Sequence, residues 1–347
     1  MDGNAKRTAT RRGWLSWLNR LVTVGFIGLV VWLVVSRAHA VDWHKVLTSL
    51  RDMPGTVLAL AAAFAAASYA IYASFDWFAR IYTRQVPKLR QFEIAIVSYA
   101  FNLNLGALIG SVGFRYRLYS RSGVDAKNIA RIVATSMITN WSGYFLLGGI
   151  VFIGRLVELP KGWEIGTIGL QLVGGGLLLL LAVYLALCAF AQNKVWTLRG
   201  TEFSLPSWPL ALTQVAASSL NWLAIAATIW VLLPDSVGFG TVLAVFLLSS
   251  VAGAMTHVPG GLGVLEAVFV ALLGGDVSQH RLIAALLAFR VFYYFGPLAI
   301  AIALYLWIEM RGRRGGAHRE RRQRKAAARN ATRPQPRVSG EALSRAP

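Results

Sequence analysis

The stretch His257-Val-Pro-Gly-Gly-Leu-Gly-Val-Leu-Glu266 lies between two apolar runs, 240–256 and 264–274, and decides how the chain folds. A helix needs about 20 apolar residues to cross the hydrocarbon layer of a bilayer. At about 1.5 Å per residue, the second run reaches only about half of that thickness. Proline and glycines interrupt the helix here, and the freed backbone groups survive at membrane depth only where protein or a wet cavity satisfies them. We therefore predict a polar site inside the membrane part.

The composition is typical of a polytopic membrane protein. Hydrophobic residues make up 56% of the 347 residues, and long apolar runs recur along the chain. The net charge of +20 would suggest nucleic acid in a soluble chain, but here the basic residues flank apolar runs, so no nucleic-acid partner is expected. The single cysteine, Cys188, allows neither an internal disulfide nor a Cys-based metal site.

The apolar runs predict an all-α architecture with six full spans and two re-entrant broken-helix segments. The re-entrant candidates are 93–111, which enters and leaves on the cytoplasmic side, and 240–274. The expected full spans are 21–36, 56–80, 128–154, 167–191, 208–233 and 283–309.

The Lys/Arg distribution sets the predicted orientation. With both termini cytoplasmic, 27 basic residues fall in cytoplasmic segments and six in external loops. If 93–111 were instead a full span, which its length alone allows, the basic residues that follow it would lie outside. Since basic residues favour the cytoplasmic side of a membrane, we prefer the re-entrant interpretation.

The chain divides into three regions. Residues 1–20 form a basic cytoplasmic N-terminus, 21–310 the integral membrane domain, and 311–347 an Arg-rich cytoplasmic tail expected to be disordered. The twin arginines before the first span also resemble an export signal superficially, but we prefer to interpret them as the positive inner flank of a first span. The tail either binds anionic lipid or only holds the terminus inside.

An ionisable residue inside a span is a functional candidate by default. Arg290 lies about a third of the way into the last predicted span, and Glu266 is its nearest counter-charge in sequence. Either the pair ties two helices together, or Arg290 faces a phosphate or carboxylate with Glu266 tuning or releasing it. Asp76 lies four residues before Arg80, and an i,i+4 ion pair is a sufficient explanation for it.

The first break combines amides, glycines and arginines. Asn102 and Asn104 precede Gly106, Gly110 and Gly113, and Arg115 and Arg117 follow them. Glycines at helical spacing also favour close helix packing. Two arginines two residues apart diverge on a helix but share a side in an irregular segment, where guanidinium groups suit a phosphodiester. Further polar lining is expected from Asn140 and His257, although a hydrogen-bonded structural role is the simpler interpretation for each, as it is for Asn221.

Broken apolar segments in matching halves are typical of transporters with a site at the membrane midplane. Here one break is expected to enter from the inside and the other, at Pro259, Gly260, Gly261 and Gly263, from the outside. This arrangement suggests an inverted repeat in which the two breaks enclose a hydrated, positively charged groove.

An ordered set of motifs resembles one known family. The set comprises Tyr99-Ala-Phe-Asn-Leu-Asn-Leu-Gly106, Gly113-Phe-Arg-Tyr-Arg-Leu-Tyr-Ser-Arg-Ser-Gly123, Thr139-Asn-Trp-Ser-Gly-Tyr144, Pro259-Gly-Gly-Leu-Gly-Val-Leu-Glu266 and Arg290-Val-Phe-Tyr-Tyr-Phe-Gly-Pro297. From about residue 20 to 310 the chain resembles the YbhN-type bacterial inner membrane proteins and the membrane region of lysylphosphatidylglycerol synthase/flippase proteins.

The resemblance implies a flippase-like domain with paired re-entrant helices in the bacterial cytoplasmic (inner) membrane. Carried over by position, Arg115, Arg117, Glu266 and Arg290 become the candidates that handle a lipid head group, which we expect to be anionic. Where many relatives carry a Pro-Gly-Arg-x-Gly-Glu type motif in the first break, this chain has Ile109-Gly-Ser-Val-Gly-Phe114. The aminoacyl-transferase domain of the bifunctional relatives is missing, so lysyl transfer is not expected.

Three functions fit these observations. The first is phospholipid translocation through the groove. The second is a non-transporting scaffold for a separate lipid-synthesising or cell-envelope enzyme. The third, a membrane-embedded transferase that uses Glu266 or His257 as base, is disfavoured because no nucleophile, nucleotide-binding motif or metal-ligand set is visible. We therefore expect no catalytic activity, cofactor or metal; the lipid, the energy source and the oligomeric state do not follow from the sequence.

Overall fold

The computed structural model of the chain describes residues 48, 51–156, 166–190, 195–198, 201–256, 261 and 263–310. Five of its helices are long and apolar enough to cross a membrane: Gly55–Phe78, Ala126–Ile153, Ile168–Phe190, Trp208–Trp230 and Gln279–Met310. They coincide with five of the six predicted spans to within a few residues. The first predicted span, 21–36, and the tail 311–347 lie outside the described residues. The predicted all-α polytopic architecture is confirmed, and the contacts described below lie within the compact unit that ends at Ala301.

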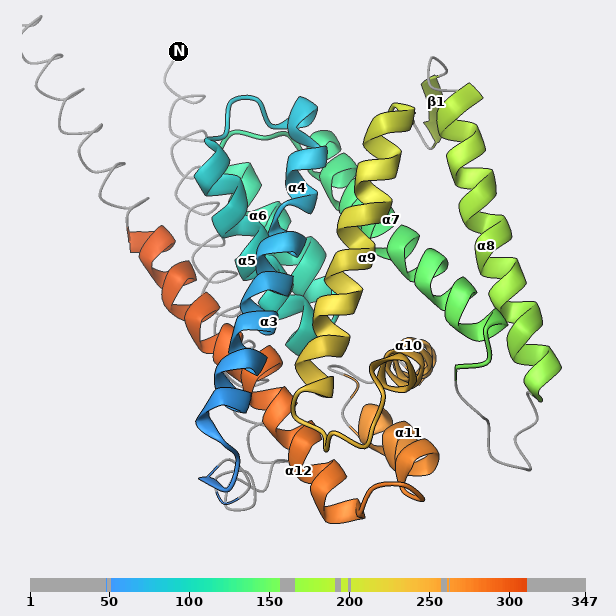
Figure 1. Cartoon of the computed structure of the whole chain (residues 1–347). Coiled ribbons are helices and arrows are strands. Elements are labelled where there is room, and N and C mark those ends of the chain that lie inside the picture. The colour runs from blue at the N-terminus through green and yellow to red at the C-terminus, as the bar shows by residue number, and fades with distance from the viewer. Residues whose placement is uncertain are drawn as a thin grey trace, which may run out of the picture. The chain divides into compact units, whose positions relative to one another are not determined.

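The spans are built from several helical elements, which Figure 1 labels. They are α3 (Gly55–Ala73), α4 (Phe75–Phe78), the 3-10 turn η1 (Arg80–Tyr82), α5 (Lys88–Leu105), the π-helix η2 (Ala107–Gly113), α6 (Phe114–Arg121), α7 (Ala126–Ile153), α8 (Thr167–Phe190), α9 (Trp208–Trp230), α10 (Phe239–Thr256), α11 (Val264–Leu273), α12 (Gln279–Arg290) and the π-helix η4 (Val291–Phe295). A short antiparallel hairpin, β1 (Val195–Leu198) and β2 (Thr201–Ser204), connects α8 to α9. The hairpin was not foreseen from the sequence.

Local sequence signals explain where the main helices begin. Pro54 precedes α3 and Pro87 precedes α5, and both prolines have the extended backbone that leads into a helix. Asp125 caps α7, because its carboxylate accepts a hydrogen bond from the backbone N–H of Asn128 at 2.9 Å. The alanine-rich α3 then packs along α9, and α9 packs along α7.

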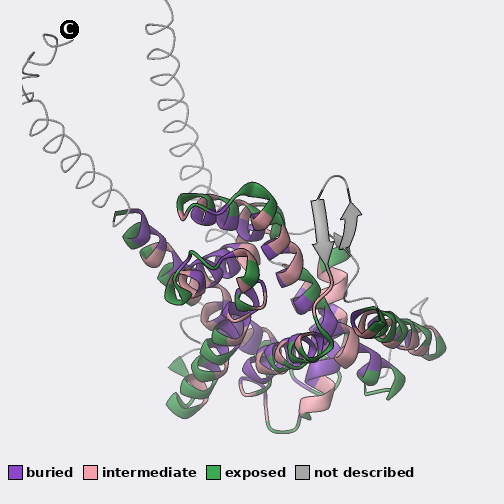
Figure 2. Ribbon diagram, turned by 90° about the horizontal axis from the view of Figure 1, so that it is seen from above, coloured by how far each residue is buried: buried purple, intermediate pink, exposed green. Residues whose placement is uncertain are grey.

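The outer helix faces are apolar and exposed, as a lipid solvent requires. On α8 the side chains of Leu172, Leu179 and Leu180 are 72%, 66% and 55% exposed. Figure 2 shows exposed residues on the outward sides of the helices and buried ones on the sides that face neighbouring helices. Exposed leucines in this number would be unfavourable in water, but they cost nothing against hydrocarbon.

The first break folds the chain into a helical hairpin. At Gly106, φ is +86°, a backbone conformation that strongly favours glycine, and the chain reverses there between α5 and η2. The reversal brings η2 against α5 so closely that a Cβ on Gly110 would lie 2.0 Å from the backbone nitrogen of Asn102. The Phe101 and Phe114 rings stack with their centroids 3.9 Å apart.

The second break gives a similar hairpin from α10 and α11, which pack against each other. Gly261 and Gly263 have φ values of +56° and +81°, so both occupy the left-handed region. The predicted breaking residues Pro259 and Gly260, together with His257, lie outside the described residues. Helix α11 has 10 residues and reaches about 15 Å, half of a hydrocarbon layer. Re-entry into the membrane stays a prediction for both hairpins.

Candidate functional site: a polar cavity where the two breaks meet

A cavity of about 310 Å³ lies where the two hairpins approach each other. The first hairpin contributes Asn102 and Leu103, one turn before its break, and the second contributes Gly253, Gly261 and Leu265. Helices α3, α7 and α9 and the π-helix η4 supply the remaining wall. The volume falls at the lower end of the range for small-ligand sites, which leaves room for a compact polar group.

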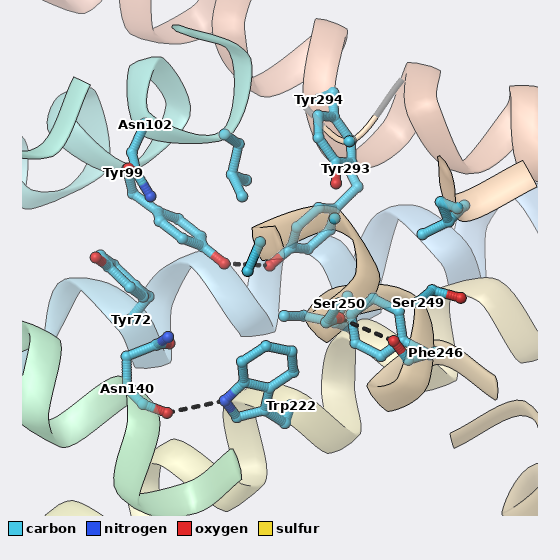
Figure 3. A pocket seen from close by; sticks show the side chains of 16 residues that line it. Tyr72, Tyr99, Asn102, Asn140, Trp222, Phe246, Ser249, Ser250, Tyr293 and Tyr294 are labelled. Carbon is cyan, nitrogen blue, oxygen red and sulfur yellow. Dashed lines mark hydrogen bonds between the residues drawn. The ribbon is translucent and has the colours of Figure 1, made fainter. Parts of the chain in front are cut away.

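Aromatic rings and uncharged polar groups line this cavity, as Figure 3 shows. The rings come from six residues on five different elements: Tyr72, Tyr99, Trp222, Phe246, Tyr293 and Tyr294. The polar groups include the amides of Asn102 and Asn140 and the hydroxyls of Ser249 and Ser250. Among the described lining residues there is no Asp, Glu, Lys, Arg or His. The sequence predicted a positively charged groove, and the described lining is instead neutral.

A chain of hydrogen bonds fixes the floor of the cavity. The hydroxyl groups of Tyr99 and Tyr293 are 2.8 Å apart, and the Tyr293 hydroxyl is 2.6 Å from that of Ser68. Ser68 donates to the side-chain oxygen of Asn221 at 2.7 Å. The interhelical hydrogen bond predicted for Asn221 is therefore confirmed. Because buried hydroxyls are stable only when paired, this network holds α3, α5, α9 and η4 in one arrangement.

The side-chain amides of Asn102 and Asn140, which line the cavity, behave differently from the amide of Asn104. Figure 3 shows the side chains of Asn102 and Asn140 at the cavity, and neither amide has a hydrogen-bond partner within the described part of the chain. The backbone carbonyl of Asn140 accepts from Trp222 at 2.9 Å and from Ser218 at 2.7 Å, which fixes the residue in place. Asn104 instead donates to the carbonyls of Ala100 and Tyr294, so it ties the first break to η4.

Arg290 and Glu266 form the predicted ion pair beside the cavity. The guanidinium Nε and one amino group of Arg290 each donate to a carboxylate oxygen of Glu266, the latter at 2.9 Å. The same amino group donates to the carbonyl of Gly261 at 3.1 Å. The carboxylate of Glu266 also accepts a hydrogen bond from the backbone N–H of Gly263. The guanidinium also lies 5.2 Å from the centroid of the Tyr294 ring, which lines the cavity. The pair therefore joins the second break to α12.

Arg115 lies in a second ion pair, and the sequence assigned its partner wrongly. Asp76 does not pair with Arg80. Its carboxylate accepts three hydrogen bonds from Arg115, two from Nε at 3.2 Å and one from an amino group at 2.9 Å, and one from the Tyr119 hydroxyl at 2.7 Å. Arg80 donates to the carbonyl of Val86 and to Gln91 instead. Both side chains of the Asp76–Arg115 pair are 0% exposed.

The surroundings of Arg115 bear on its predicted role. Its guanidinium also donates to the hydroxyls of Ser111, at 2.6 Å, and Ser136, at 3.1 Å. It is absent from the lining of the cavity. Arg117 follows on the same α-helix, α6, so the two side chains diverge and do not share a side. The spacing of Arg115 and Arg117 left both a helix and an irregular segment open, and the chain forms a helix here. We assign Arg115 to holding the first hairpin against α4.

The tyrosines are the functional candidates that sequence reasoning missed. Tyr99 is three residues before Asn102, and Tyr293 and Tyr294 follow Arg290 by three and four, so each lies near a helical turn already singled out. A hydroxyl-bearing ring inside an apolar span was the available signal, because such a hydroxyl needs a partner in lipid.

Comparison with known proteins finds membrane-protein relatives along most of the chain. A family profile described as "Lysylphosphatidylglycerol synthase TM region" matches residues 20–301. The inner membrane protein YbhN of Escherichia coli strain K12 is 45% identical over 297 residues, which cover 85% of this chain and 93% of that protein. A Synechocystis protein, "Uncharacterized protein slr0712", is 32% identical over 79% of this chain and 86% of its own length. The phosphatidylglycerol lysyltransferase of Staphylococcus haemolyticus is 25% identical over 63% of this chain, but the match covers only 25% of that protein.

The helices, the breaks and these matches define a multi-pass membrane protein. The chain belongs to the family of the lysylphosphatidylglycerol synthase transmembrane region.

Proposed function

We propose that this protein binds lipid head groups in the cavity between the two breaks and moves phospholipids between the leaflets of the bacterial inner membrane. The observation that carries the proposal is the polar cavity itself, bounded by two interrupted helices inside an apolar bundle. A polar cavity of this kind is unfavourable in a bundle that only anchors, since each polar group at membrane depth needs a partner.

The Arg290–Glu266 pair supports the same proposal. It holds the second hairpin against α12 beside the cavity, and its two side chains are 3% and 21% exposed. A partly exposed carboxylate can exchange its contact with Arg290 for another group, whereas the fully enclosed Asp76–Arg115 pair is placed for stability alone. In this proposal Arg290 serves as the cation that a lipid phosphate meets when the pair opens. The protein acts without a catalytic step of its own and has both termini in the cytoplasm.

Reconstitution tests the proposal directly. Vesicles of phosphatidylcholine with the purified full chain carry a trace of phospholipid labelled on its acyl chain, and a membrane-impermeant reductant scores the label in the outer leaflet. We expect label to become accessible from both leaflets with the native chain, and Arg290→Gln and Glu266→Gln to abolish the movement. Arg281→Gln, at an exposed position on α12, is the matched control and should move lipid at the native rate.

Two outcomes would reject the proposal. If Arg290→Gln and Glu266→Gln both move lipid at the native rate, the pair has no part in movement. If the native chain moves no lipid while it is correctly inserted, the role as a scaffold for a lipid-synthesising enzyme becomes the better explanation, and an enzyme of that class should co-purify with it.

A further inference from the structure

The cavity wall combines free amides with aromatic rings and lacks charge, and this combination restricts which head group it can hold. The amides of Asn102 and Asn140 come from opposite sides, one from α5 and the other from α7. Each amide offers two N–H donors and one oxygen acceptor, and within the described residues neither is engaged. An unpaired amide at this depth requires a ligand or water that both donates and accepts.

A cationic head group fits the wall poorly. No carboxylate is present among the described lining residues, and the nearest one, Glu266, is occupied by Arg290. A ring face can hold an ammonium group, but the Tyr72 and Tyr99 rings stack on each other with centroids 3.6 Å apart, so each turns one face to the other and not to the cavity. An ammonium group would therefore be buried here without a counter-charge, which is unfavourable.

A bare anion fits no better. The two arginines nearest to the breaks, Arg115 and Arg290, each donate to a carboxylate, so neither presents an uncompensated charge to the cavity. The serine hydroxyls of the wall are also committed as donors: Ser249 donates to the carbonyl of Val245 and Ser250 to that of Phe246. They face the cavity as acceptors, which suits a ligand that brings its own O–H donors.

We propose that the cavity selects an uncharged polyhydroxyl head group, in which neighbouring hydroxyls of a sugar ring or of glycerol bridge the amides of Asn102 and Asn140. A hydroxyl both donates and accepts, so two adjacent hydroxyls satisfy an amide N–H and an amide oxygen together. The C–H faces of such a group can pack on the rings of Trp222 and Phe246, whose centroids are 5.6 Å apart. This inference rests on the proposed function, because it names the part of the lipid that the cavity holds.

The same vesicles, with four tail-labelled lipids compared one at a time, test the selection. The lipids are a glucosyl diacylglycerol, phosphatidylglycerol, phosphatidylethanolamine and phosphatidic acid, which present a sugar, a glycerol, an ammonium and a bare phosphate. We expect the first two to cross about tenfold faster than the last two, since two hydrogen bonds distinguish them. The ratio between the first two shows whether sugar or glycerol is the preferred source of the hydroxyls.

Variants of the two cavity asparagines test whether the preference among lipids arises in the cavity. Asn102→Ala and Asn140→Ala should each lower the rate for the hydroxyl-bearing lipids roughly three- to tenfold and so remove most of their advantage over phosphatidylethanolamine. Asn128→Ala, in the first turn of α7 and outside the cavity lining, is the matched control and should keep the native preference. A melting curve of each variant establishes that it is folded.

The outcomes separate this inference from the proposed function. Equal rates for all four lipids, or the fastest rate for phosphatidylethanolamine or phosphatidic acid, overturn the inference and leave lipid movement standing. If no lipid moves, thermal stabilisation in a polyoxyethylene detergent gives a second measurement. Stabilisation by the glucosyl lipid and phosphatidylglycerol, lost in Asn102→Ala and Asn140→Ala, would then support the binding site without transport. No such stabilisation would reject both.

Discussion

Arg290 and Glu266 lie 24 positions apart in the sequence and form a two-point ion pair that closes the second break. At the first break Arg115 and Asp76, 39 positions apart, form the corresponding contact. Each pair joins one arm of a hairpin to an unbroken span. The two ion pairs have opposite polarity, because the hairpin carries the arginine at the first break and the carboxylate at the second.

The fully buried pair should be essential for stability. Asp76→Ala leaves the guanidinium of Arg115 buried without a counter-charge, which costs about 3–5 kcal/mol. We expect a large drop in the melting temperature of the purified protein in detergent. The double variant Asp76→Leu with Arg115→Met should recover most of that loss, because no charge remains. Arg84→Ala, at an exposed position, should leave the melting temperature unchanged. A double variant as unstable as the single one would contradict this account.

The second pair should matter less for stability and more for activity. Glu266 is 21% exposed, so water can partly solvate Arg290 when the carboxylate is removed, and Glu266→Ala should lower the melting temperature less than Asp76→Ala does. Lipid movement in vesicles should nevertheless be lost. Melting temperature and lipid movement together test this prediction. Equal destabilisation by Glu266→Ala and Asp76→Ala would mean that both ion pairs are purely structural.

The first hairpin depends on the missing side chain of Gly110. Gly110→Ala places a Cβ within 2.0 Å of the Asn102 backbone, a contact that only a shift of η2 away from α5 can relieve. We expect reduced stability together with reduced lipid movement. Gly176→Ala on α8 is the matched control, because nothing lies within 4 Å of its Cβ, and alanine there should be neutral or stabilise the helix by up to about 1 kcal/mol. Loss of stability in Gly176→Ala and not in Gly110→Ala would show that the close approach is not required.

The hydroxyl of Tyr293 should hold the floor of the cavity. Tyr293→Phe removes its hydrogen bonds with Ser68 and Tyr99 and leaves both partners buried, at a cost of about 1–3 kcal/mol. The melting temperature should fall accordingly. Tyr116→Phe, whose ring is 53% exposed, should have no effect. Equal melting temperatures of native protein and Tyr293→Phe would mean that the network adds nothing to stability.

Re-entry of the first hairpin can be tested by labelling. In a background with Cys188→Ser, cysteines replace Arg84 and Lys127, before and after the hairpin, and Asp235 and Asp276, before and after the second one. All four positions are exposed. We expect an impermeant thiol reagent to label the first two from one side of the membrane and the last two from the other. Labelling of Arg84→Cys and Lys127→Cys from opposite sides would instead make 93–111 a full span.

The sequence predicted the described spans and the second ion pair, because both depend on local information. A run of apolar residues is sufficient to place a span, and Glu266 follows the break directly, so few other partners for Arg290 were available. The helix break at Gly106 was also predicted from local information, because glycines interrupt an apolar run there; the positive φ at Gly106 is a finding of the structure.

The partner of Asp76 and the tyrosine network depend on how helices are rotated against one another, which the sequence does not state. An i,i+4 arginine was a sufficient local partner for Asp76, yet the hairpin brings Arg115 closer. Tyr99 and Tyr293 are 194 positions apart, and nothing in either segment signals that their hydroxyls meet. The expected positive groove failed for the same reason, because Arg115 and Arg290 each pair with a carboxylate across a tertiary contact.

The exchanged charges of the two ion pairs have a consequence for assembly. If the first hairpin settled on the last span, Arg115 would face Arg290; if the second hairpin settled on the first described span, Glu266 would face Asp76. Like charges brought together inside a bilayer repel strongly. Each hairpin therefore pairs favourably with its own span and unfavourably with the other span, so the opposite polarity of the two ion pairs distinguishes the observed docking of the hairpins from the exchanged one.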